Sequence, residues 1–341
     1  MLGVVKSKPE IGIEIREVLE PDHLKKNQVL IEVKACGVCG SDLHIYQWEP
    51  FIQWIKLPRV LGHEVAGTVC KVGAEVKEFE LGDRIVADTW GGCGDCYYCR
   101  LGKFNLCMYQ TRLGQHVDGG MAKYVIVPKN SLYKIPEQIG FQEASAIEPL
   151  GVILRTFERC DLKPGDDIAI IGPGPIGLFG VMLAKASGAA KIIVCGLNED
   201  RDRLKLAEKF GAIPVNVAEE SPKEKVFDLT EGKGADIVMD VSGGRGSLAE
   251  AANIAKPGGQ IGLVGIGPES VFAPNIVVDK ELSIHGSFRR QPSTWFRAIK
   301  LVANKVIDTR EIITHALPLT KAEEAFQILM RKEGIKVILL P

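Results

Sequence analysis

Four cysteines of the chain crowd into one short stretch, with two residues between each of the first three and seven before the last. They are Cys93, Cys96, Cys99 and Cys107. Zn²⁺ binds four thiolates tetrahedrally at roughly 2.3 Å, and such a closed shell leaves no position for a substrate. The spacing therefore predicts a structural zinc site rather than a disulfide framework. A four-cysteine iron–sulfur cluster is the alternative, because the same spacing fits it.

A second set of potential metal ligands is spread over the first half of the chain. Cys39 lies in the segment GVCGSDLH, His63 and Glu64 are adjacent in GHE, and Glu148 begins EPL. One thiolate, one imidazole and carboxylates form a mixed shell with an exchangeable position, the composition of a catalytic zinc site. Successive side chains of a strand face opposite ways. His63 and Glu64 can therefore both reach one metal only if the backbone turns there or if Glu64 binds intermittently.

A glycine-rich segment follows an apolar run that ends at residue 171. It has the pattern G-x-G-x-x-G and precedes an expected helix, with Gly172, Gly174, Pro175, Ile176 and Gly177 as its candidate cofactor-binding residues. The first glycine permits a tight turn, the second lets a pyrophosphate approach the backbone, and the third lets helix and strand pack closely. The first N–H groups of the helix then face the phosphate charge. This context predicts a dinucleotide site.

The end of the next expected strand bears on the choice between NAD and NADP. An NAD site usually has a carboxylate there to bind the ribose hydroxyls, whereas this strand ends in Gly196. A glycine leaves room for a 2′-phosphate that a nearby arginine would neutralise, and this slightly favours NADP. Glu199 or Asp200 would serve NAD instead. The candidate residues at this end of the cofactor are Gly196, Asn198, Arg201 and Arg203.

The elements that must position these residues form two groups. Residues 1–150 hold short β-type runs at 13–18, 29–35, 64–72, 84–88 and 123–127, which predict an irregular, mostly antiparallel β domain. Beyond residue 150, apolar strands at 168–171, 192–194, 237–241 and 261–264 alternate with helical segments at 176–187, 201–210 and 248–255. Such alternation is typical of a doubly wound parallel sheet.

The chain length also favours two domains, since 341 residues exceed what one core usually organises. After residue 286 the alternation stops, and two helices around 295–304 and 321–331 precede a strand at 336–340. We expect this tail to rejoin the first domain. The predicted organisation is α/β: residues 1–151 with 288–341 as the metal-binding domain, and residues 152–287 as the cofactor domain.

Composition excludes several classes of protein. The 42 basic and 43 acidic residues nearly balance, and no basic stripe points to nucleic acid or a membrane surface. Residues 1–10 lack the apolar core of a secretion signal, so we expect a cytoplasmic protein. The most apolar stretch, residues 168–186, is interrupted by glycines and prolines and reads as a strand, a turn and a helix instead of a membrane span.

Taken together, these motifs resemble those of the zinc-containing medium-chain dehydrogenases, in the branch that holds sorbitol (polyol) and threonine dehydrogenases. The resemblance covers essentially the whole chain and keeps the family's order of motifs. It implies a GroES-like, β-rich catalytic domain beside a Rossmann domain. Other alcohol dehydrogenases of the superfamily carry cysteine where this chain has Glu148, and this departure is what points to the polyol and threonine branch.

The resemblance also implies roles for individual residues. Cys39, His63 and Glu64 would bind the catalytic zinc, with Glu148 in or beside its shell, and Ser41 and His44 would carry the proton released by the substrate hydroxyl. Two zinc ions per chain, NAD or NADP, and a homotetramer or homodimer are expected. A structural histidine near the metal is the alternative for His44.

The expected reaction is hydride transfer between a secondary alcohol and the nicotinamide, with a polyol as substrate and L-threonine as the alternative. The segment from His44 to Trp48, continuing through Trp54 to Lys56, resembles the threonine enzymes. A catalytically silent homologue and a zinc-free reductase are the competing classes. Zinc content separates them: about two ions per chain for the enzyme, about one for the silent homologue and none for the reductase.

Overall fold

The structure, a computed structural model, describes residues 1–341 except 51–54, 90 and 270. Trp54, part of the segment that resembles threonine dehydrogenases, lies outside the described residues. The chain forms two compact units, one made of Met1–Glu148 with Gln291–Pro341 and the other of Pro149–Arg290. The expected divisions after residues 151 and 287 each differ from these by three residues.

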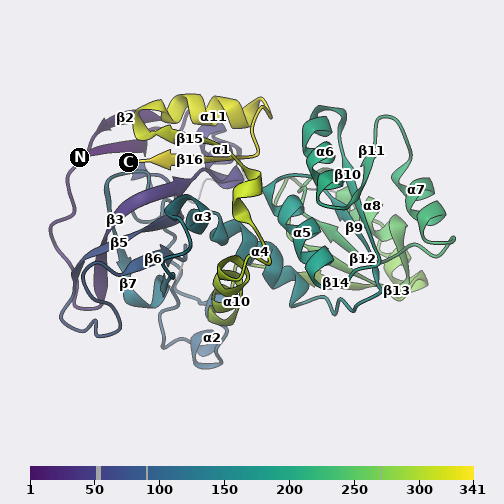
Figure 1. The fold of residues 1–341 in the computed structure, drawn as a ribbon, viewed down its shortest axis with the longest axis horizontal. Coiled ribbons are helices and arrows are strands. Elements are labelled where there is room, and N and C mark those ends of the chain that lie inside the picture. The colour runs from purple at the N-terminus through teal and green to yellow at the C-terminus, as the bar shows by residue number, and fades with distance from the viewer. Residues whose placement is uncertain (51–54, 90, 270) are drawn as a thin grey trace. The chain divides into compact units, whose positions relative to one another are not determined.

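A seven-stranded sheet in the order β15-β16-β3-β5-β6-β8, with β7 also paired to β3, forms the body of the first unit (Figure 1). Every pairing is antiparallel except that of β15 with β16. The C-terminal strand pairs with the end of β3, Ile338 opposite Gly37, which places the tail in this unit. The strands are β3 (Gln28–Gly37), β5 (Glu64–Val72), β6 (Arg84–Ala87), β7 (Tyr124–Pro128), β8 (Leu132–Lys134), β15 (Ile313–Pro318) and β16 (Lys336–Leu340).

A smaller sheet and several helices complete the first unit. The sheet has the order β2-β1-β4, with β1 (Leu2–Lys6), β2 (Glu14–Glu17) and β4 (Arg59–Val60). Helix α10 (Pro292–Ala303) is held in place by Trp295, whose buried ring stacks on the ring of Tyr133 with 5.1 Å between centroids. The helices are α1 (Gly40–Gln47), α2 (Tyr97–Arg100), α3 (Phe141–Ser145), α10 (Pro292–Ala303) and α11 (Ala322–Met330), while α4 (Ile147–Phe157) begins here and continues into the second unit.

Short 3-10 turns connect several of these elements. In the first unit they are η2 (Phe104–Leu106), η3 (Lys129–Ser131), η5 (Thr309–Ile312) and η6 (Leu319–Lys321), and in the second unit η4 (Asn198–Asp200).

The second unit is a parallel sheet in the order β11-β10-β9-β12-β13-β14. The strand order reverses beside β9, and the central strands are mostly apolar because helices cover both faces of such a sheet. The strands are β9 (Asp167–Ile171), β10 (Lys191–Gly196), β11 (Ile213–Asn216), β12 (Ala235–Asp240), β13 (Ala255–Leu263) and β14 (Ser283–Gly286). The helices are α5 (Pro175–Ala186), α6 (Arg201–Lys209), α7 (Pro222–Leu229), α8 (Ser247–Ile254) and α9 (Asn275–Asp279).

Each unit has its own hydrophobic core. In the first, buried side chains of β3, β5 and β16 pack with Phe326 of α11. In the second, Ile193 of β10, Val238 of β12 and Ile261 of β13 belong to one buried cluster with the alanines of α8. Among the described residues, no helix combines the length and apolarity needed to cross a bilayer.

Candidate metal and cofactor sites

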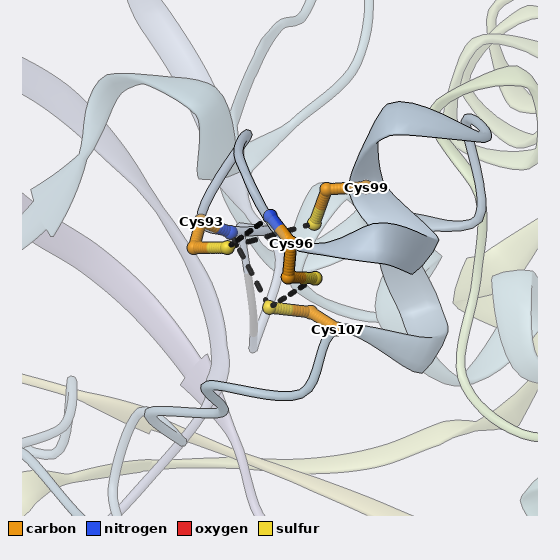
Figure 2. Close-up of side chains that lie close together, drawn as sticks. All are labelled: Cys93, Cys96, Cys99 and Cys107. Carbon is orange, nitrogen blue, oxygen red and sulfur yellow. Dashed lines mark hydrogen bonds between the residues drawn. The ribbon is translucent and has the colours of Figure 1, made fainter.

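The four-cysteine loop brings its sulfur atoms together. The Sγ atoms of Cys93, Cys96, Cys99 and Cys107 all lie within 4.8 Å of one another, and Figure 2 shows them converging from the loop and from helix α2. Two of the S···S separations are 3.9 Å, from Cys93 to Cys99 and from Cys96 to Cys107. A tetrahedron with metal–sulfur bonds of 2.3 Å has edges of about 3.8 Å, whereas a disulfide requires about 2.05 Å. The four sulfurs therefore fit one tetrahedral metal ion.

Backbone N–H groups support the same thiols. The amide of Cys93 donates to Cys107 Sγ and that of Cys96 to Cys93 Sγ, both at 3.4 Å. N–H groups of Met108 and Cys99 lower the pKa of Cys96 to about 6, while burial raises the pKa of Cys99 to about 12 and also raises that of Cys107. Three of the four cysteines are buried, and holding all four as neighbouring thiolates requires a cation to compensate their charge, as a structural zinc would.

The mixed donor set lies at one end of the large sheet of the first unit. Cys39 follows β3 and is the N-cap residue of α1, where its N–H donates to Asp42 Oδ2 at 3.0 Å in a capping box. The antiparallel register places Glu64, the first residue of β5, opposite Gly37 at the end of β3. Strand β3 ends and strand β5 begins at this end of the sheet. Side chains that are far apart in sequence therefore meet there.

A turn in the backbone brings His63 to this end of the sheet. Gly62 has φ +93°, a conformation that favours glycine, and it immediately precedes the histidine. The buried imidazole Nδ1 lies 3.7 Å from Asp42 Oδ1, and neither buried atom has a hydrogen-bond partner among the described residues. Burial opposes protonation of His63, but Asp42, Cys39 and Glu148 outweigh it and raise the pKa of His63 to about 10. So much negative charge around one imidazole is the environment in which a divalent cation binds.

Glu64 is turned toward a different partner. Its two carboxylate oxygens accept from Lys336 Nζ at 2.7 and 2.8 Å, and Lys336 also donates to the carbonyl of Val38 at 3.0 Å. Both side chains are buried. Burial raises the pKa of Glu64, and the charge of Lys336 works against that shift. A Cβ at Gly37 would overlap this carboxylate, so glycine is required for the pair to form.

Glu148, Ser41 and His44 complete the predicted catalytic group. Glu148 is buried on α4, and its Oε1 accepts from Thr89 Oγ1 at 2.9 Å, two residues after β6. Ser41 and His44 lie half-buried on α1, with His44 Nδ1 3.2 Å from Glu49 Oε1. Among the described residues, the four-cysteine set alone gathers three or more ligand atoms within 4.8 Å of one another. The residues of the mixed donor set therefore lie near one another without forming a closed metal-binding site.

The glycine-rich turn has the shape that dinucleotide binding needs. Gly172, directly after β9, has φ +107°, and a Cβ on Gly177 would overlap the Gly172 carbonyl oxygen, which shows how closely helix and turn pack. A Cβ at Gly174 would meet nothing within 4 Å. Gly174 is the N-cap residue of α5, and Pro175 and Ile176 are the first two residues of the helix. The open side of Gly174 and the free N–H groups beyond it are where a pyrophosphate fits.

The residues after β10 divide into two groups. Asn198 Oδ1 accepts from Arg201 Nε at 2.9 Å and lies 3.3 Å from Asn216 Nδ2 at the end of β11. Arg203 instead turns toward Asp200, Nη1 to Oδ1 3.5 Å, and Asp200 Oδ2 accepts from the amide of Leu197. Arg201, not Arg203, is therefore the arginine that lies against Asn198.

Comparison with known proteins agrees with these observations. Residues 25–137 match the alcohol dehydrogenase GroES-like domain, and residues 175–304 match a zinc-binding dehydrogenase domain. The L-threonine 3-dehydrogenase of Bacillus velezensis is 36% identical over 100% of this chain and 99% of its own length. The sorbitol dehydrogenase of Halalkalibacterium halodurans is 34% identical, with the same coverage. The chain belongs to the zinc-dependent medium-chain dehydrogenases.

Solved structures of the family share the fold. An alcohol dehydrogenase from Thermus sp. ATN1 superposes with a TM-score of 0.93 at 31% identity, covering 100% of this chain and 99% of that one. A zinc-binding dehydrogenase from Sinorhizobium meliloti bound to NADP and an alcohol dehydrogenase from E. coli complexed with NADH both have TM-scores of 0.90, at 29% and 30% identity and with the same coverage. This medium-chain dehydrogenase is therefore an alcohol dehydrogenase that uses zinc and a nicotinamide cofactor, as its motifs predicted.

Three residues around the donor set of this dehydrogenase were not singled out from the sequence. Asp42 faces His63, Thr89 donates to Glu148, and Lys336 holds Glu64. Asp42 had a visible signal, since it stands three residues after Cys39 where a capping box places an acidic side chain. Lys336 had none, because it is 272 residues from Glu64.

Proposed function

We propose that this dehydrogenase oxidises a secondary hydroxyl of a polyol or sugar alcohol with NAD or NADP, and reduces the ketone in reverse. The observation that carries the proposal is the set of Cys39, His63 and Glu148 at one end of the sheet: burial lowers the pKa of His63, but the negative charges of Asp42, Cys39 and Glu148 raise it to about 10. An open set of thiolate, imidazole and carboxylate fits a catalytic zinc. The four-cysteine cluster fits a second, structural zinc, so we infer two zinc ions per chain.

Zinc held by this set would supply a Lewis acid that lowers the pKa of a bound hydroxyl, and the nicotinamide would accept the hydride. The protein supplies the placement. Asp42, whose Oδ1 lies 3.7 Å from His63 Nδ1, would orient the imidazole, as carboxylates beside metal-binding histidines do, and Thr89 donates a hydrogen bond to the carboxylate of Glu148. Ser41 and His44, on the helix that begins after Cys39, are in our proposal the groups that carry the released proton away.

Glu64 has a different task in this proposal. Both oxygens of its carboxylate accept hydrogen bonds from Lys336. Glu64 would therefore bind the metal only when this ion pair breaks. We therefore assign Glu64 as an intermittent ligand, and Cys39, His63 and Glu148 as the standing ones. The turn at Gly62 lets His63 face the metal while Glu64, the next residue, faces Lys336.

L-Threonine is the second candidate substrate. The L-threonine 3-dehydrogenase and sorbitol dehydrogenase relatives are 36% and 34% identical to this chain, which does not separate the two activities. The segment from His44 to Trp48, which resembles the threonine enzymes, favours the amino acid. Both substrates present a secondary hydroxyl to the same chemistry.

A substrate panel with both cofactors tests the proposal. Initial rates are compared for sorbitol, xylitol, simple secondary alcohols, sugar-alcohol phosphates and L-threonine, each with NAD and with NADP. Turnover of polyols well above that of L-threonine supports the polyol proposal, and the reverse order replaces it with the second candidate. No turnover of any secondary alcohol by a zinc-loaded protein would refute both.

We also propose a homotetramer or homodimer, on the family resemblance. Sedimentation equilibrium measures the assembly directly, and a species with the mass of one 37.1 kDa chain would contradict it.

A further inference from the structure

Four polar side chains form a cluster where the adenosine ribose of a dinucleotide would bind. This ribose-end cluster consists of Asn198, Arg201, Asn216 and Glu219, contributed by the segment after β10, the start of α6, the end of β11 and the turn after β11. Arg201 donates through Nε to Asn198 and through Nη2 to Glu219. Its guanidinium thus lies between the amide expected near the ribose and a carboxylate.

At the end of β10, Gly196 has no room for a carboxylate and Asp200 is already paired. A Cβ on Gly196 would lie 2.8 Å from Pro173 Cγ in the phosphate turn, so this position cannot carry a carboxylate without displacing the turn. Asp200 is buried and caps the amide of Leu197, and it pairs with Arg203. The ribose-end cluster is therefore a group that can distinguish a 2′-hydroxyl from a 2′-phosphate, beside the exposed Glu199.

Glu219 changes what Arg201 offers to a ligand. A guanidinium alone beside the ribose would attract a 2′-phosphate, because it binds phosphate oxygens through paired N–H groups. Here one of its N–H groups is taken by a carboxylate, and that carboxylate would repel the phosphate. Asn198 and Asn216, being neutral, suit hydroxyl groups. We propose that Glu219 sets the cofactor preference of this enzyme, by pairing with Arg201 so that NAD binds in preference to NADP.

The size of the effect follows from elementary electrostatics. Arg201 and Glu219 are both 59% exposed, so their pair contributes little to folding stability. A doubly charged phosphate about 6 Å from a carboxylate in water is repelled enough to weaken binding roughly tenfold. Salt screens such a repulsion, so the preference for NAD should shrink as ionic strength rises.

The inference rests on the proposed nicotinamide-dinucleotide function, and its test measures binding alone. Dissociation constants for NADH and NADPH are determined by fluorescence titration at low and high salt for the parent protein, Glu219→Gln and Glu220→Gln. Glu220 is the matched control, because it loses the same charge at the adjacent position but pairs with Lys225 instead, 3.1 Å away. The double variant Arg201→Gln/Glu219→Gln tests the part played by the arginine.

We expect the parent to bind NADH more tightly than NADPH. Glu219→Gln should strengthen NADPH binding about tenfold and change NADH binding less than about twofold, while Glu220→Gln leaves the ratio unchanged. The double variant should lose the gain. A parent that prefers NADPH, an unchanged ratio in Glu219→Gln, an equal shift in Glu220→Gln, or a gain that survives loss of Arg201 would each overturn the inference. Failure of every variant to bind NADH would instead refute the dinucleotide function itself.

Discussion

Lys336→Met removes one partner of a buried ion pair and should strongly destabilise the first unit. Lys336 makes three hydrogen bonds, to both oxygens of Glu64 and to the carbonyl of Val38, at 2.7 to 3.0 Å. Glu64 is fully buried, so the substitution leaves its charge without a partner. Breaking such a pair from one side costs about 3–5 kcal/mol. For a unit of about two hundred residues this lowers the melting temperature by about 6–20 °C.

Differential scanning calorimetry of matched variants measures this effect. Lys336→Arg keeps the charge and should lie close to the parent. The double variant Lys336→Met/Glu64→Gln replaces both charges, which is often nearly neutral for stability, and should recover most of the loss. Zinc content is measured on each sample, so that metal loss is not mistaken for loss of the pair. A single variant that melts within about 2 °C of the parent, or a double variant as unstable as the single one, would refute the reasoning.

Two further substitutions test the metal loop and the phosphate turn. Cys99→Ala removes one buried thiolate of the four-cysteine cluster, and because a closed metal site contributes folding free energy, it should lose one zinc and melt at a lower temperature while still binding NADH. Unchanged metal content and melting temperature would contradict the structural role, and a brown protein would indicate iron and sulfur. Gly177→Ala places a methyl group against the Gly172 carbonyl and should weaken binding of NADH and NADPH by roughly 5- to 150-fold, since repacking such an overlap costs about 1–3 kcal/mol. Gly174→Ala, whose Cβ would meet no protein atom within 4 Å, is the control for folding and should melt like the parent. A Gly177→Ala protein that binds both cofactors as the parent does would show that the turn tolerates displacement.

The parts of this structure that the sequence predicted are those with short-range patterns. The phosphate turn lies within six consecutive residues, and its glycines sit as their spacing predicted, one at φ +107°, one open and one tightly packed. Strand β5 and the terminal strand β16 have the bounds expected from the sequence, residues 64–72 and 336–340. Strands β11 and β14 were missed: β11 contains Pro214, which counts against a strand, and the edge strand β14 has little buried surface to give an apolar run.

Long-range pairing is what the sequence did not reveal. Lys336 and Glu64 meet because β16 pairs with β3 and β3 with β5, a register that no local pattern encodes. The two arginines after β10 looked equivalent in sequence, yet they lie two residues apart on α6 and turn to different partners, Arg201 to Asn198 and Arg203 to Asp200. The restriction at Gly196 arises from Pro173, which belongs to another turn.

The zinc content and activity of Cys39→Ser test the central claim most directly. Cys39 is half-buried at the start of α1, and an open metal site contributes less to folding than a closed one. The parent should contain about two zinc ions per chain and Cys39→Ser about one, with most of the dehydrogenase activity lost and with NADH binding and melting temperature nearly unchanged. Full activity in a variant that has verifiably lost that zinc would contradict the account.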